Sequence, residues 1–285
     1  MKTVIADIKR YWQDRPFLWS GKQYFPAGYV RLPISGRVLV LAPHPDDPES
    51  VAITCRLLAQ SGCEIWYAVV SLSPAGVEDE YARKWDFGGS LSLKEIKGRI
   101  RRREQIRSAE MFGLSSNRIA FLGIAEERNL DSHENIDRIK DHLDSIAPDL
   151  VILPAGKDSN RTHAWVNRTF RMCATALTIK KRKSIVGLYN EDPKTLEIRK
   201  DLFVLFNEED ARWKGNLLKN HDSQQQRNLR SRKIGFDERI LRMNHESWRQ
   251  LCETAFLAGQ PDRYAEAFEI ELFDEVNKIN RSIPC

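Results

Sequence analysis

Residues 37–49 read RVLVLAPHPDDPE, and this stretch decides the fold. Residues 37–43 form a short run dominated by β-branched residues and leucines, which is typical of a strand buried on both faces. His44, Asp46 and Asp47 follow directly, separated and flanked by prolines. Open α/β sheets bind their ligands at the carboxyl ends of their strands. The stretch therefore predicts a buried parallel strand that ends in a functional site.

Further apolar runs follow along the chain and alternate with segments of helical character. They cover residues 64–72, 119–124, 149–155, 184–189 and 201–206. Strands that alternate with helices favour a parallel sheet in a layered α/β fold. We therefore expect a mostly parallel sheet with the site at the C-terminal edge of its strands.

Helices are predicted from the spacing of apolar residues and from signals at their ends. The most regular one covers residues 136–146, where isoleucine and leucine follow the 3.6-residue period. Asp131 and Glu134 resemble a capping box at its start. Other helices are expected over 91–113, 208–226 and 236–257, and residues 74–90 are expected to be a loop.

The composition limits the class of protein. Hydrophobic residues make up 41% of the 285 residues, which is enough for a sizeable core. We expect one domain over 37–285, preceded by an aromatic-rich extension over 1–36. The chain has no apolar stretch near the roughly 20 residues of a membrane span, and no signal-peptide pattern. We therefore expect a cytoplasmic protein, in which the five scattered cysteines are reduced.

The turn after the first strand is a candidate metal site. His44 and Asp47 are three residues apart, so their side chains can converge on one ion. A simpler interpretation is that Asp47 caps a helix and Pro48 occupies its first turn. That interpretation gives no role to His44 or Asp46, whereas a metal site gives a role to both.

A third ligand is offered by the loop that follows the strand at 149–155. This loop ends at His163, which lies at the same edge of the predicted sheet as the first turn. Hydrolytic zinc sites typically have three protein ligands and one open position. His133, His142 and His245 are weaker candidates, because isolated histidines on helices are usually structural or solvated.

The order of these motifs resembles the PIG-L/LmbE family of zinc-dependent N-acetylglucosamine deacetylases, whose first motif reads [AP]-H-P-D-D-x-E. Three later family motifs are matched in order and spacing, and the resemblance covers about residues 37–268. The matching residues are Arg101, Glu104, Ser108, Ala109, Phe112 and Gly113; Phe121, Leu122, Gly123 and Glu126; and Lys214, Leu217, His221, Ser223 and Gln224. A fourth match comprises Tyr264, Ala265, Glu266 and Phe268.

The resemblance implies a Rossmann-like three-layer α/β sandwich that removes an N-acetyl group from an amino sugar or its conjugate. It also implies three ligands for zinc or another divalent transition metal, one general base and three substrate-binding residues. The implied metal ligands are His44, Asp47 and His163, and the implied general base is Asp46. The implied substrate-binding residues are Arg101, Asn160 and His221.

Two positions depart from the family pattern. Asn160 stands where many members have a histidine, and an amide cannot deliver a proton. The proton for the leaving amine then comes from Asp46 or His221, or the activity is reduced. Glu126 replaces an aspartate, and we expect this to alter the substrate geometry and to leave the metal site unchanged.

Partners and alternative functions follow from charge and chemistry. The chain has 45 Lys and Arg against 40 Asp and Glu, a net charge of +5, so an anionic small-molecule substrate such as a sugar phosphate is one hypothesis. Basic runs are more often solvated faces.

Alternatives to a deacetylase are an amidase for another acyl group or a thiol conjugate, a catalytically silent metal-binding homologue, and a nucleic-acid-binding protein. We expect no nucleic acid partner, and a homo-oligomer is compatible with the aromatic extension.

Overall fold

The computed structural model describes residues 23–24, 36–85, 87–127, 129–181, 183–254 and 262–274. Of the predicted extension over 1–36, only strand β1 (Gln23–Tyr24) and residue 36 lie within these ranges. In the described part of the chain, no helix is long and apolar enough to cross a membrane.

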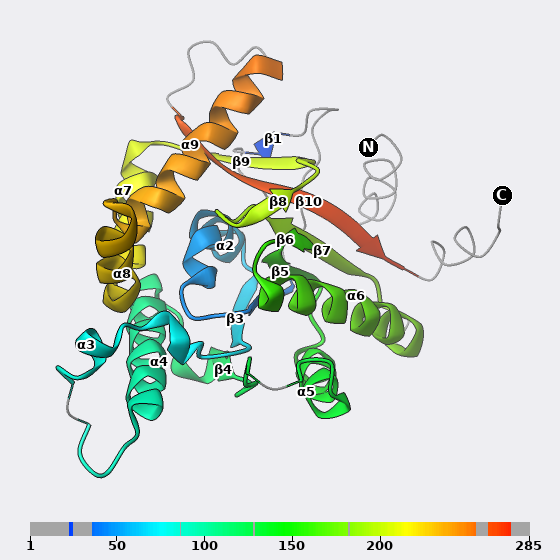
Figure 1. Cartoon of the computed structure of the whole chain (residues 1–285). Helices are drawn as coiled ribbons and strands as arrows, with labels where there is room; N and C mark the ends of the chain where they lie inside the picture. Colours follow the sequence, from blue (N-terminus) through cyan, green and yellow to red (C-terminus); the bar gives the residue numbers. More distant parts are fainter. Residues whose placement is uncertain are drawn as a thin grey trace.

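An eight-stranded sheet runs through the described part of the chain in the order β1-β9-β10-β7-β5-β2-β3-β4 (Figure 1). The parallel strands are β2 (Arg37–Ala42), β3 (Glu64–Val69), β4 (Ile119–Phe121), β5 (Leu150–Pro154) and β7 (Ile185–Asn190). Antiparallel β10 (Tyr264–Phe273), β9 (Leu202–Phe206) and β1 extend the sheet beyond β7. The predicted parallel sheet is confirmed around β2, and the antiparallel extension was not predicted.

Alternate side chains of β2 face two different layers of helices, as the two-residue period of a strand requires. Val38 and Val40 pack in the core that includes residues of α2 (Ala52–Gln60), α4 (Leu93–Phe112) and α7 (Glu208–Lys219). Leu39 and Leu41 pack in the core that includes α5 (His133–Ile146) and α6 (Arg161–Lys181). The expected three-layer arrangement, with helices on both sides of the sheet, is confirmed.

The remaining helices lie toward the C-terminal end of the sequence. They are α8 (Asp222–Arg232) and α9 (Phe236–Thr254), and α9 packs its Leu251 against alternate side chains of β9 and β10. Shorter elements are η1 (Asp47–Val51), η2 (Pro74–Gly76), α3 (Asp79–Ala82), η3 (Ser116–Arg118) and the paired strands β6 (Lys157–Asp158) and β8 (Thr195–Glu197).

Three local predictions are wrong. Helix α5 is capped by Ser132 and not by Asp131, which instead forms an exposed ion pair with Arg168. The segment 74–90 is not only a loop, because η2 and α3 form within it and Val77 and Ala82 pack against Ile100. The single helix expected over 208–226 is two helices, and the break between them places His221 in a fully buried position.

Helix α6 and strand β10 were not predicted from the sequence. The stretch YAEAFEIELF of β10 contains three glutamates, which weaken the usual signal of a buried strand. All three have partners in the fold, and Glu269 lies 3.8 Å from both Arg171 and Arg199. Glu266 pairs with Lys214, and Glu271 accepts a hydrogen bond from the Tyr189 hydroxyl at 2.6 Å. These partners lie 52 and 82 residues away in the sequence, so no local pattern could indicate them.

The Lys214–Glu266 pair joins β10 to the first turn after β2. Both side chains are buried, and the Lys214 Nζ lies 2.7 Å from the Glu266 Oε1. Lys214 also donates to the Ser50 carbonyl at 2.6 Å, in η1, and to Asn244 Oδ1 at 2.8 Å. Glu266 accepts from the backbone N–H groups of Ile53 and Thr54, at the start of α2. The pair is therefore satisfied by hydrogen bonds as well as by charge.

We expect Lys214→Met to destabilise the protein strongly, because it leaves the Glu266 carboxylate buried without its counter-charge. Loss of one partner from a buried pair typically costs about 3–5 kcal/mol. Urea unfolding measures the effect. The control is Lys94→Met, which removes an exposed ion pair with Glu127 and should cost less than about 1 kcal/mol. Similar losses in the two variants would contradict this role for the buried pair.

Candidate metal centre and substrate pocket

The turn after β2 has an unusual backbone at Asp46. This residue has φ of 97°, in the left-handed region that non-glycine residues seldom adopt. Asp46 is also the residue that precedes η1, and its side chain makes no capping hydrogen bond. The Asp47 carboxylate turns back and accepts from the His44 backbone N–H at 2.7 Å. The helix-cap interpretation of Asp47 therefore does not describe this turn.

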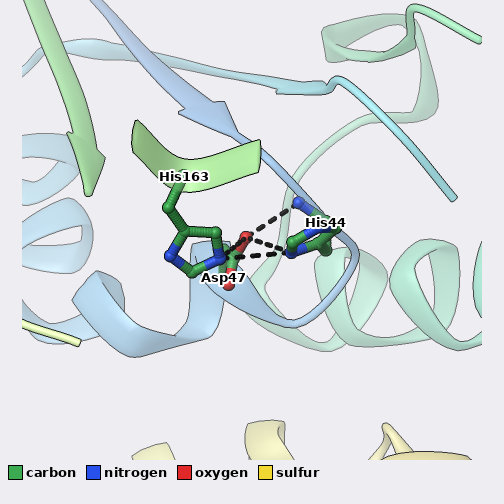
Figure 2. Close-up of side chains that lie close together, drawn as sticks. All are labelled: His44, Asp47 and His163. Carbon is green, nitrogen blue, oxygen red and sulfur yellow. Dashed lines mark hydrogen bonds and ion pairs between the residues drawn. The ribbon is translucent and has the colours of Figure 1, made fainter. Parts of the chain in front are cut away.

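His44, Asp47 and His163 bring one ligand atom each to a common point (Figure 2). His44 lies in the turn after β2, Asp47 begins η1, and His163 lies in the first turn of α6 and not in a loop as expected. The His44 Nδ1 is 3.4 Å from the Asp47 Oδ2 and 3.2 Å from the His163 Nε2. The His163 Nε2 is 3.6 Å from the same Asp47 oxygen.

These three separations match the edges of a tetrahedral zinc site. Two ligand atoms about 2.1 Å from zinc and separated by the tetrahedral angle lie about 3.4 Å apart. Two imidazoles and one carboxylate are also a ligand set that zinc accepts. The residues therefore fit the metal that the sequence implies, with room in the set for a fourth ligand.

Carboxylates hold the outer nitrogens of both histidines. The Glu126 Oε1 lies 2.5 Å from the His44 Nε2, and Glu126 also accepts from the Thr162 hydroxyl at 2.8 Å. The Asp158 Oδ2 lies 3.2 Å from the His163 Nδ1. Such contacts orient the ring so that the other nitrogen faces the metal. We expected Glu126 to affect substrate geometry alone, but its contact with His44 places it in the support of the candidate metal centre.

The electrostatics of the three side chains reflect this mutual contact. Burial lowers the pKa of His44, but Asp47 and Glu126 outweigh it and raise the pKa to about 9. Burial likewise lowers the pKa of His163, and the Asp47 carboxylate raises it above its usual value. For Asp47, burial raises the pKa, whereas His163 and His44 lower it below the usual range. The centre is thus a compact group whose charges compensate one another.

Asp46 is held from α4. Its carboxylate accepts from the Arg101 Nη2 at 2.8 Å, and its backbone N–H donates to the Gln105 Oε1 at 3.1 Å. Arg101 also donates to the Pro45 carbonyl, and only 2% of its surface is exposed. The guanidinium predicted to contact substrate is therefore engaged with the turn, although it still contributes to the pocket wall.

His221 is buried away from the pocket. Its side chain has no exposed surface, it is not among the residues that line the pocket, and its Nε2 lies 3.0 Å from the Glu49 Oε2. Glu49 in turn accepts from the Gln105 amide at 3.0 Å. Burial lowers the pKa of His221, but Glu49 raises it above the usual value. This position does not favour the predicted contact of His221 with substrate.

A pocket opens beside the candidate metal centre. His44, Asp46, Asp47 and His163 line one part of it, together with Asn160. Asn160 precedes α6, where its Oδ1 accepts from the Thr162 N–H at 2.9 Å. The segment 192–194, helix α8 and the first turn of α9 complete the wall. Six of the seven predicted site residues therefore meet at this pocket, and His221 does not.

Comparisons with known proteins agree with this architecture. Residues 39–174 match the family described as PIG-L: GlcNAc-PI de-N-acetylase. The matched range includes every pocket residue predicted from the sequence and ends inside α6. Helices α7–α9 and strands β7–β10 lie outside the family match.

The solved structures that resemble the chain share its fold at low sequence identity. The hydratase GalB from Pseudomonas putida KT2440, described as a 4-carboxy-2-hydroxymuconate hydratase, has a TM-score of 0.62 and 20% identity, over 82% of this chain and 95% of that one. The N,N'-diacetylchitobiose deacetylase from Pyrococcus horikoshii has a TM-score of 0.59 and 19% identity, over 82% and 83%. A deacetylase of teicoplanin biosynthesis has a TM-score of 0.56 and 17% identity, over 84% and 99%. No curated protein sequence matches the chain significantly.

We expect the purified protein to bind about one zinc ion per chain, as a three-ligand site requires. His163→Ala should lose this ion, because only two of the three protein ligands would remain. Elemental analysis after dialysis measures the content. His133→Ala, on the exposed start of α5, is the control and should keep the metal. Equal metal in the His163 variant and the wild type would contradict the assignment.

Glu126→Ala should weaken metal binding without abolishing it. Removal of a carboxylate behind a histidine ligand typically lowers metal affinity about 10–100-fold. Competition with a chromogenic chelator gives the affinity. The neighbouring Glu127→Ala serves as the matched control, because Glu127 is half exposed and pairs only with Lys94 among the contacts described. An unchanged affinity in the Glu126 variant would separate this residue from the metal centre.

Proposed function

We propose that this protein is a metal-dependent hydrolase that removes an N-acetyl group from an amino sugar or an amino-sugar conjugate. The observation that carries the proposal is the convergence of His44, Asp47 and His163 with Asp46 in one pocket of a PIG-L family domain. The two deacetylases among the similar structures support the same class of reaction. Zinc bound by the three ligands would polarise the amide carbonyl and lower the pKa of a water molecule towards neutrality.

Asp46 is the group placed to accept a proton from that water. It lines the same pocket as Asp47 and is not part of the three-residue ligand group. The Arg101 guanidinium donates a charge-assisted hydrogen bond to the Asp46 carboxylate and fixes its position. A general base must be both charged and correctly oriented when the reaction begins.

The leaving amine needs a proton, and the geometry limits which residue can donate it. Asn160 can donate a hydrogen bond to the developing oxyanion, but it cannot supply a proton. His221 is fully buried and does not line the pocket, so it has no direct path to the amine. We therefore assign proton return to Asp46, which becomes protonated in the first step and is deprotonated again in the second.

The arginine-rich helix α4 gives little support to a nucleic-acid-binding function. Arg101 is buried against Asp46, and the Arg102 guanidinium lies 4.2 Å from the centre of the Phe121 ring. Arg103 lies 5.4 Å from the Trp85 ring, and Lys97 pairs with Asp79 at 2.6 Å. Arg101 is therefore buried, and the exposed Arg102 and Arg103 each lie against an aromatic ring.

We expect Asp46→Asn to lower kcat for acetate release by about 10²–10⁴, because general acid–base catalysis contributes that range. The metal content should stay unchanged, since Asp46 is not a ligand in this proposal. Asp131→Asn, on the surface, is the control. Acetate release from N-acetylglucosamine and N,N'-diacetylchitobiose is measured beside release of longer acyl groups from matched amides. No turnover of any amide by the metal-loaded wild type would overturn the proposed function, and faster release of a longer acyl group would favour an amidase.

A further inference from the structure

The wall of the pocket that faces the candidate metal centre carries three arginines outside the family match. Arg227 and Arg232 come from α8, and Arg239 comes from the first turns of α9. The side chains at 224, 228 and 232 are four residues apart and present one face of α8 to the pocket. The metal ligands and this cationic group therefore belong to one cavity.

None of these three guanidinium groups forms an ion pair with a described residue. Their contacts are hydrogen bonds to neutral oxygens: Arg227 to the Gly76 carbonyl and Arg239 to the Pro193 carbonyl, each at 3.4 Å. Arg232 donates to the Asn228 side chain at 3.4 Å and to the Ser231 hydroxyl at 3.2 Å. Such distances lie at the weak end of the hydrogen-bond range. Most of the donors of the three groups remain available to a ligand.

Arg230 of the same helix shows the contrast. It points away from the pocket and pairs with Glu78 at 3.2 Å and with Glu80 at 2.8 Å. Helix α8 thus carries a neutralised arginine on its outer side and unpaired arginines on its pocket side. A merely solvated basic face would not require this separation.

The acidic residues of the pocket do not neutralise the three arginines. Asp46 is paired with Arg101, Asp47 faces His44 and His163, and Asp192 accepts from the Lys194 backbone N–H at 2.9 Å. Burial and the neighbouring charge of Arg232 lower the pKa of Arg239, against the opposing effect of Asp192 and Asp46. Two guanidinium groups therefore repel each other at this wall, and an anion placed there would relieve that repulsion.

We propose that the substrate is a phosphorylated N-acetyl amino sugar, whose phosphoryl group binds Arg227, Arg232 and Arg239. This inference rests on the proposed function for the reacting end of the substrate. Planar guanidinium groups donate paired hydrogen bonds to phosphate oxygens, and charged hydrogen bonds of this kind are the strong ones. The phosphoryl group anchors the sugar in α8 and α9 while its acetamido group reaches the turn after β2. A small ligand is favoured over a nucleic acid because the arginines line the same pocket as the metal ligands.

Binding of product sugars tests the phosphoryl site independently of turnover. Titration calorimetry with glucosamine 1-phosphate, glucosamine 6-phosphate and neutral glucosamine should give a preference of about tenfold or more for one phosphorylated sugar. In Arg232→Gln and in Arg239→Gln this preference should fall to about threefold or less. Arg230→Gln, the matched control on the outer side of α8, should keep the wild-type preference.

A binding preference that is absent, or that is the same in all three variants, would overturn the proposal. Tighter binding of single-stranded DNA than of either sugar phosphate, lost in the same two variants, would also overturn it in favour of a nucleic acid. The ratio of kcat/KM for acetate release from N-acetylglucosamine 6-phosphate or 1-phosphate to that from N-acetylglucosamine should fall with the binding preference. Phosphate-dependent binding without release of acetate would keep the phosphoryl site and reject the deacetylase.

Discussion

The backbone of Asp46 is the constraint on which the site depends. A left-handed conformation at a non-glycine residue costs about 1–3 kcal/mol, so the surrounding structure must hold it. Gln105 accepts the Asp46 N–H, and Arg101 binds both its carboxylate and the preceding carbonyl. In return, the turn points the Asp47 carboxylate toward the two histidines, whereas the Asp46 carboxylate faces Arg101. Adjacent aspartates obtain different environments in this way.

The site divides between two parts of the chain. The PIG-L family domain supplies the turn after β2, the α4 residues that support it and the start of α6. The later helices supply the opposite wall, and strand β10 supplies Glu266, which supports the start of α2. The two parts are also joined by the small sheet of β6 and β8, which connects the segment before His163 to the segment after Asp192. In the function that we propose, residues near the reacting bond and residues that select the rest of the substrate have separate origins in the sequence.

Local patterns in the sequence were sufficient for the parallel strands and for the position of the site. The run within 37–42 is apolar on both faces because helices cover both sides of β2. The polar residues that follow it have few structural roles that would explain them apart from a functional site. The helix that ends at Gly113 was predictable from its composition, and Gly113 has the positive φ of 93° that a helix end of this type needs.

The missed features depend on contacts between distant residues. Glu126 was judged from its place in a motif, but its role comes from contact with His44, 82 residues earlier. His221 resembled a pocket residue in sequence, yet the helix break before α8 turns it toward buried Glu49. Strand β10 was hidden by glutamates whose partners lie in other elements. Charge compensation across the fold has no local signature in the sequence.

The hydrogen bonds from α2 to Glu266 also have a consequence for the order in which the molecule can assemble. Ile53 and Thr54 are made early in synthesis, and the carboxylate that satisfies their N–H groups is made more than 200 residues later. A ribosome-bound chain that already contains His44, Asp47 and His163 still lacks this support. The start of α2 thus obtains this support only after β10 has left the ribosomal tunnel, so a prematurely terminated chain would retain the candidate metal ligands but not this part of their scaffold.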